Sequence, residues 1–474
     1  MTMITERSRG LILSDVSLND LGIKVERIKD LKDLIKYMKH QTFGDEPTLV
    51  AYRGVWRDLD KIFEEANVNG VNLYNLDFID TYLEKHFAKN LINIERIIYA
   101  RFIRLFYSET IKTPVRISGS KSITRRDLLR SHIRTILQYI NKPIVNDKMC
   151  LMLPHCNICV DTCPKKAISG KPPSIQYNLC DLCGLCISVC PVEAIYTPQT
   201  TSRSIEEYLS IIKKFSREPM KIVIIQYHLL KDLMNIRSED IKYPFIVLPV
   251  WSLKEISSLM ILKMIYLGFT PILYGEETIN HLIDLFRLGA IKLVNNLNEL
   301  ITLLSEDTLY KSRREEIPGF RIYAVETLSL FTNESSLNFP GASYIEIDKD
   351  RCTLCGACVR TCPTKALRIL DVNNERRLVF EPLQCISCKE CENICPEKAL
   401  RVRWLFKRDY YQEEKILTSS PIVHCSICGA PIETEIFISR VEEKLRKAGA
   451  YEALKYTRIC EKCKTKLILQ SMIE

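Results

Sequence analysis

Sixteen of the twenty cysteines in this 474-residue chain repeat one spacing four times, and each copy ends in Cys-Pro. Three copies follow C-x2-C-x2-C-x3-C-P without deviation, and the first copy departs only at its first cysteine. Three thiolates two residues apart can wrap a short loop around one iron-sulfur cube, while the fourth cysteine is carried to the neighbouring cube. The spacing therefore predicts paired [4Fe-4S] clusters.

Under this scheme, neighbouring copies exchange their fourth cysteines. The expected ligand sets are Cys150, Cys156, Cys159 and Cys190 for cluster 1, Cys180, Cys183, Cys186 and Cys163 for cluster 2, Cys352, Cys355, Cys358 and Cys395 for cluster 3, and Cys385, Cys388, Cys391 and Cys362 for cluster 4. In the first copy, Leu153 occupies the position of the first ligand. We expect Cys150 to replace it, with His155 as the weaker alternative.

Zinc and disulfides are the competing interpretations of clustered cysteines. Zinc sites use two pairs of cysteines rather than a triplet followed by Cys-Pro. Disulfide frameworks are typical of short secreted chains. Both interpretations are weak here, because the same signature recurs four times.

A different cysteine pattern follows the last copy. Cys425 and Cys428 form one C-x2-C pair, and Cys460 and Cys463 form another. Two such pairs are typical of a tetrahedral four-sulfur site. We expect zinc there, with a single rubredoxin-like iron as the alternative.

The segments around the cysteines predict a multidomain chain that combines α/β and α+β parts. Apolar runs alternate with amphipathic stretches before the first cysteine, and buried strands at 221–225, 245–249 and 271–274 alternate with helices at about 252–267 and 277–288. The expected parts are an α/β domain without cysteines (1–144), a first two-cluster module (145–200, module I), a second α/β domain (201–305), a linker (306–340), a second two-cluster module (341–410, module II) and a zinc-ribbon-like segment (411–474).

Each Cys-Pro is followed by the same short phrase, as in Lys365-Ala366-Leu367. Since proline suits the first turn of a helix, we expect each fourth cysteine to lie where a short helix begins. The alanine of the phrase should then pack close to the cluster.

The formal charge of +9 is basic, but the expected cofactors compensate for it. Sixteen thiolates around four oxidised cubes, together with a four-thiolate zinc site, would bring the charge close to zero. This argues against nucleic acid as a partner. The longest apolar stretch, 253–269, is interrupted by Lys254, Glu255 and Lys263, so no membrane span is expected. Reduced thiols in this number favour the cytoplasm, or the cytoplasmic face of a membrane complex.

Both two-cluster modules resemble bacterial-type 2[4Fe-4S] ferredoxins. Residues 47–52 and 62–74 are similar to the N-terminal part of the flavin-binding subunit of heterodisulfide reductase. Residues 221–293, with the runs 247–250 and 267–270, resemble the small iron-sulfur subunit of methyl-viologen-reducing hydrogenase. Those relatives carry cysteines in both regions and this chain has none there, and it contains no G-x-G-x-x-G phosphate loop.

The resemblance implies an electron-transfer iron-sulfur subunit of a multisubunit oxidoreductase, without a catalytic residue of its own. Its catalytic partner would be a hydrogenase, a formate dehydrogenase or a heterodisulfide-reductase-like enzyme, docked on the α/β domains. Two alternatives stay open. One is a self-contained reductase with flavin or nucleotide bound in 218–305, and the other is a structural or nucleic-acid-binding iron-sulfur protein.

Overall fold

The computed structural model describes residues 11–18, 24–39, 46–69, 71–89, 91–108, 115–116, 137–138, 142–154, 156–216, 218–311, 322–331, 339 and 342–471. The chain divides into two compact units. Unit 1 comprises Met1–Leu151, Ile158–Gly319 and Glu326–Phe331, and unit 2 comprises Met152–Asn157, Phe320–Val325 and Thr332–Glu474.

Unit 1 begins with a parallel four-stranded sheet of strand order β2-β1-β3-β4. Its elements are β1 (Leu11–Ser14), β2 (Lys24–Arg27), α1 (Leu31–Met38), β3 (Thr48–Ala51), α2 (Val55–Asn69), η1 (Leu73–Asn75), β4 (Leu76–Ile79), α3 (Thr81–Phe87) and α4 (Ile94–Phe106). β3 and β4 are buried along their whole length, as is typical of parallel strands that are covered on both faces. The α/β prediction for this region is confirmed.

A second parallel sheet in unit 1 has the order β12-β11-β13-β14. Its elements are α8 (Ser202–Phe215), β11 (Met220–Gln226), η3 (Tyr227–Asn235), η4 (Ser238–Asp240), β12 (Phe245–Val250), η5 (Leu253–Glu255), α9 (Ser258–Tyr266), β13 (Phe269–Tyr274), η6 (Asn280–Leu282), α10 (Ile283–Arg287), β14 (Lys292–Val294) and α11 (Leu297–Ser305). The parallel α/β arrangement is as expected from the sequence.

The helix expected at about 252–267 is split into η5 and α9. The backbone N–H of Ser252 donates to Glu255 Oε1 at 3.0 Å, which closes a separate turn. The hydroxyl of Ser257 then caps α9 by accepting from Met260 N at 3.1 Å. The apolar pattern does not show where one helix is capped and the next begins, so it predicts a single helix where the chain forms two shorter ones.

One apolar core joins the two sheets of unit 1. Val50 and Phe78 from the first sheet and Val223 and Val247 from the second belong to the same cluster of buried side chains. Arg101 of α4 is fully buried between them, where it donates to Asp77 Oδ1 and to the Val247 carbonyl, both at 2.6 Å. The two α/β parts therefore pack as one body.

Module I also belongs largely to unit 1. It contains β7 (Ile144–Val145), α6 (Ile158–Thr162), β8 (Ile168–Ser169), β9 (Ser174–Ile175), α7 (Leu185–Val189) and β10 (Ile195–Tyr196), and the short strands β5 (Val115–Arg116) and β6 (Leu137–Gln138) pair before it. β7 pairs with β10 and β8 with β9, all antiparallel. This pairing gives the compact α+β arrangement expected for a two-cluster module.

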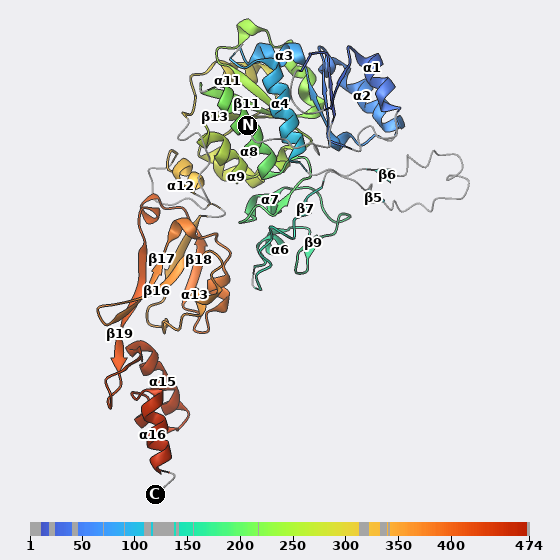
Figure 1. Ribbon diagram of the computed structural model, residues 1–474. Coiled ribbons are helices and arrows are strands. Elements are labelled where there is room, and N and C mark those ends of the chain that lie inside the picture. The colour runs from blue at the N-terminus through green and yellow to red at the C-terminus, as the bar shows by residue number, and fades with distance from the viewer. Residues whose placement is uncertain are drawn as a thin grey trace, which may run out of the picture. The chain divides into compact units, whose positions relative to one another are not determined.

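Unit 2 contains module II and the C-terminal segment. The elements are β15 (Ser343–Ile347), α13 (Ala357–Thr361), β16 (Leu367–Val372), β17 (Glu375–Phe380), η7 (Pro382–Gln384), α14 (Glu390–Ile394), β18 (Leu400–Trp404), η8 (Arg408–Tyr411), β19 (Lys415–His424), β20 (Pro431–Thr434), α15 (Glu435–Lys447), η9 (Tyr451–Tyr456) and α16 (Glu461–Ser471). One antiparallel sheet, β16-β17-β19-β20, crosses the boundary expected at residue 410 (Figure 1). The C-terminal segment is therefore joined to module II through β19.

The expected linker 306–340 includes α12 (Ile322–Leu328), whose Tyr323, Ala324 and Leu328 are buried. This part is a packed helix, and 312–321 and 332–338 lie outside the described residues. Within the part of the chain that the structure describes, no helix has the length and apolar character of a membrane span.

Candidate iron-sulfur and metal sites

Two cavities in module II are each lined by four thiols. One, with about 370 Å³ of empty space, is lined by Cys352, Cys355, Cys358 and Cys395. The other, with about 350 Å³, is lined by Cys385, Cys388, Cys391 and Cys362. Each cavity thus combines three cysteines of one copy with the fourth cysteine of the other. The structure brings together the sets expected for clusters 3 and 4.

Module I contains a cavity of the same kind. About 360 Å³ of empty space is lined by Cys180, Cys183, Cys186 and Cys163, the set expected for cluster 2. All three cavities have the same composition, with three cysteines of one copy and the fourth cysteine of its neighbour. The same donor set in three places is what three copies of one inorganic group require.

Three of the four cysteines expected for cluster 1, Cys150, Cys159 and Cys190, belong to one apolar cluster. Cys150 lies near enough to Cys190 to contribute to the raised pKa of that thiol, although burial is the main cause. Cys159 belongs to α6, and Cys156 belongs to the segment Met152–Asn157 of unit 2. His155, the alternative first ligand, lies outside the described residues. The ligand set of cluster 1 therefore stays a prediction.

The helix of each copy lies before its Cys-Pro, so the expectation that Cys-Pro begins a helix is wrong. α7, α13 and α14 carry the third cysteine and end at the fourth, so that Cys190, Cys362 and Cys395 are their C-caps. The second residue after each Cys-Pro has a left-handed backbone, with φ of 49°, 53°, 57° and 50° at Lys166, Glu193, Lys365 and Lys398. A left-handed residue cannot continue a right-handed helix.

That left-handed turn brings the following alanine back to the cysteine. The backbone N–H groups of Ala167, Ala194 and Ala399 donate to the fourth-cysteine sulfurs of their own copies at 3.3, 3.2 and 3.3 Å. These alanines are also almost fully buried. The expected close packing of alanine at the cluster site is present, and its N–H adds a hydrogen bond of the kind that tunes cluster potential.

The thiols in the cavities do not ionise readily unless a positive charge lies beside them. Burial raises the pKa of Cys358 and of Cys388 to about 12 in each case. Holding four thiolates in such a cavity therefore requires a compensating positive charge, which an iron-sulfur core supplies. The donor set and its burial both fit a [4Fe-4S] cluster.

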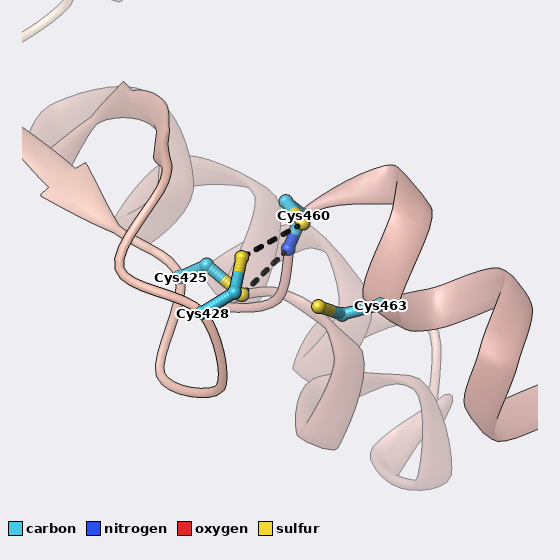
Figure 2. A group of neighbouring side chains, drawn as sticks. All are labelled: Cys425, Cys428, Cys460 and Cys463. Carbon is cyan, nitrogen blue, oxygen red and sulfur yellow. Dashed lines mark hydrogen bonds between the residues drawn. The ribbon is translucent and has the colours of Figure 1, made fainter.

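The C-terminal pairs converge as a separate site. The sulfur atoms of Cys425, Cys428, Cys460 and Cys463 all lie within 4.8 Å of one another, and Figure 2 shows the four side chains turned inward. The first pair follows β19, where Gly429 takes a φ of 70°, and the second begins at α16. The Cys460 N–H donates to Cys425 Sγ at 3.3 Å, and this bond is the main cause that lowers the pKa of Cys425 to about 6. The group has the donors and spacing to hold one metal ion.

The walls of the cavities contain residues that sequence reasoning did not single out. Ile369 and Leu378 from β16 and β17 line the cluster 3 cavity, and Ile345, Phe380 and Val402 line the cluster 4 cavity. The available signal was the period-two alternation of apolar residues in these strands. It predicts which face of a strand is buried, but not which cofactor lies beneath it.

Comparison with known families matches two segments of the chain. Residues 351–399 match a family described as the 4Fe-4S dicluster domain, and residues 173–196 match the 4Fe-4S binding domain. The first match spans all eight cysteines of module II, and the second spans the regular copy of module I. No curated protein that was compared with the chain matches it. The chain therefore contains 4Fe-4S cluster-binding domains of the ferredoxin type.

Proposed function

We propose that this chain is the electron-transfer iron-sulfur subunit of a multisubunit oxidoreductase, and that it relays single electrons through four [4Fe-4S] clusters. The observation that carries the proposal is the composition of the cavities. In the three that the structure describes in modules I and II, four thiols are set in walls that are mainly apolar. A cube held by four thiolates has every iron protected from substrate, so its chemistry is one-electron transfer.

The proposal assigns no bond-making step to the chain. Its residues hold the clusters, exclude water and set their potentials through backbone N–H groups directed at sulfur. The substrate chemistry would then belong to a catalytic partner such as a hydrogenase, a formate dehydrogenase or a heterodisulfide-reductase-like enzyme. The α/β body of unit 1 would be the docking surface for that partner.

The direct test is the iron content and reducibility of the anaerobically prepared protein. We expect about sixteen cubane irons per chain and four sets of paramagnetic signals that appear and disappear in a potentiometric titration. Cys355→Ser should alter one signal, and Cys388→Ser should alter a different one, so each variant is a control for the other. Far fewer irons, or irons that accept no electrons, would refute the proposal.

A second test concerns the partner. The chain purified with its catalytic partner should be reduced when that enzyme receives its own substrate, within the catalytic turnover time. If the clusters stay oxidised during turnover, the relay role is wrong. Salt-sensitive binding to RNA or DNA by a chain with redox-inactive clusters would instead support the nucleic-acid-binding alternative.

The edge of the second sheet disfavours a self-contained flavin or nucleotide reductase. Nucleotides bind parallel sheets of this kind at the carboxyl ends of the strands, where the strand order reverses, here between β11 and β13. At that place Gln226 Oε1 lies only 2.5 Å from where a Cβ on Gly275 would be. Beside it, Glu277 accepts from the Ser252 hydroxyl at 2.8 Å and from Leu253 N at 2.6 Å. Gln226 and Glu277 therefore take part in contacts within the chain at this edge of the sheet. A flavin absorption band that remained after iron removal would reverse this conclusion.

A further inference from the structure

The first turn of α15 lies against the loop that carries the first ligands of cluster 3. Thr434, the N-cap of α15, is fully buried, and its hydroxyl donates to the Thr353 carbonyl at 3.4 Å. Thr353 lies between Cys352 and Cys355 and lines the cluster 3 cavity. Ile436, on the same turn, packs against the apolar core that includes Cys352 and Cys358.

Two further contacts follow along the helix. Arg440 Nη2 donates to the carbonyl of Asp350, two residues before Cys352, at 3.4 Å. Lys444 Nζ lies 3.2 Å from Glu397 Oε1, and Glu397 lines the cluster 3 cavity two residues after Cys395. Three successive points of α15 therefore contact both segments that supply cluster 3 with ligands.

The four-cysteine site contacts the same helix through Arg458. Its guanidinium holds Glu435 in a two-point contact at 2.6 and 3.0 Å, and its Nε donates to Glu442 Oε1 at 3.1 Å. The carbonyl of Arg458 accepts from Ser426 N at 3.1 Å. Since Ser426 follows Cys425 and Arg458 precedes Cys460 by two residues, one residue ties both cysteine pairs to α15.

We propose that the C-terminal segment is a clamp: the four-cysteine site fixes Arg458, Arg458 fixes α15, and α15 holds the two ligand-bearing segments of cluster 3 closed against water. The inference rests on the proposed function, because it needs a reducible cluster at that site. Arg458 is a positioning residue in this arrangement, and Thr434 is the contact through which it acts.

Cluster 4 provides the internal comparison. None of the described residues of α15 lines either cavity, but the hydrogen bonds and the ion pair of α15 given above reach Thr353, Asp350 and Glu397, which lie beside ligands of cluster 3. Loosening the clamp should therefore expose cluster 3 and leave cluster 4 unchanged. A reduced cube carries one more negative charge than an oxidised cube, so exposure to water favours reduction and raises the potential of cluster 3.

The experiment compares three full-length variants with the wild type under anaerobic conditions. Arg458→Met removes the link between the site and α15. Thr434→Val leaves the cysteine pairs and Arg458 in place but removes the hydrogen bond to the cluster 3 loop, together with the N-cap bond that the Thr434 hydroxyl accepts from Phe437 N. Lys455→Met, which removes an exposed ion pair with Glu452 in the same segment, is the matched control. Iron and zinc contents are measured first, and the cluster 3 signal is identified by its alteration in Cys355→Ser.

We expect Arg458→Met and Thr434→Val to shift the cluster 3 midpoint potential to a more positive value and to accelerate iron release from that cluster to a ferrous chelator several-fold. The other three clusters and the Lys455→Met variant should match the wild type. If neither variant changes cluster 3, or if both change all four clusters equally, the clamp is wrong. A wild-type chain without sixteen reducible irons is a separate result, which refutes the proposed function before the variants are compared.

Discussion

Gly184 of module I lies in close contact with Lys254, which follows β12 of the second sheet. Replacing Gly184 by alanine should therefore destabilise the protein more than the same change at Gly356. The two glycines occupy the same position of the repeat, one residue after the second cysteine, with φ of 76° and 73°. A Cβ on Gly184 would lie under 3.0 Å from the Lys254 carbonyl oxygen, inside the closest approach of real Cβ atoms. A Cβ on Gly356 meets only Arg360 Nη1 at 3.2 Å and Ile369 Cδ1 at 3.3 Å, which are ends of flexible side chains.

The left-handed backbone does not by itself require glycine here. Lys389 occupies the equivalent position of the last copy with φ of 61°. The conformational cost of alanine, about 1–2 kcal/mol, is therefore common to both sites. The overlap with a backbone carbonyl adds about 1–3 kcal/mol at Gly184 alone. We therefore expect Gly184→Ala to lower the free energy of unfolding by about 2–5 kcal/mol and Gly356→Ala to lower it by about 1–2 kcal/mol.

The assay is the rate of iron release from cluster 2 and from cluster 3 in each variant, with each cluster identified by a cysteine-to-serine change. Gly184→Ala should release cluster 2 iron faster, and by a larger factor than Gly356→Ala accelerates cluster 3. Gly184→Asn separates the two causes, because asparagine tolerates a left-handed backbone but still places a Cβ against Lys254. If asparagine restores wild-type behaviour, the contact with Lys254 does not matter and the reasoning is refuted.

Three further predictions concern other described contacts. Glu193→Lys should lower the free energy of unfolding of unit 1, measured by calorimetry, by about 3–5 kcal/mol, because it places a second cation beside the buried Lys263, whose Nζ lies 2.9 Å from Glu193 Oε2. The control is Lys398→Glu at the equivalent, exposed position of the last copy, which should change that free energy by less than about 0.5 kcal/mol. Burial lowers the pKa of His281 to about 4, so the unfolded state binds more protons than the folded state, and the free energy of unfolding in urea should fall as the pH falls below about 6.5. His281→Asn should make that fall shallower, and the same dependence of the unfolding free energy on pH in the variant and the wild type would contradict the prediction. Cys428→Ser should remove one zinc per chain by elemental analysis, with the cubane iron retained as long as no chelator is present, whereas loss of a single iron instead of zinc would identify the rubredoxin-like alternative.

The chemistry of the chain could be predicted from local spacing alone. Three cysteines separated by two residues determine how a short loop can surround a cube, and this depends on no distant part of the chain. For the same reason the C-x2-C pairs indicated a metal site, and the buried runs at 221–225 and 245–249 indicated parallel strands. The helix expected after Cys-Pro was an error of the same local reasoning, because proline permits a helix start but the left-handed residue at Lys365 does not allow the helix to continue.

What the sequence by itself determined is which residues could hold metal, since ligand type and spacing are properties of a few neighbouring positions. Only the tertiary structure decided what surrounds them. The return of β19 beside β17, the packing of Thr434 on Thr353 and the approach of Lys254 to Gly184 each join residues far apart in the chain. Such contacts depend on how buried faces pack against one another in three dimensions, and a pattern of apolar residues shows that a face is buried without showing what covers it.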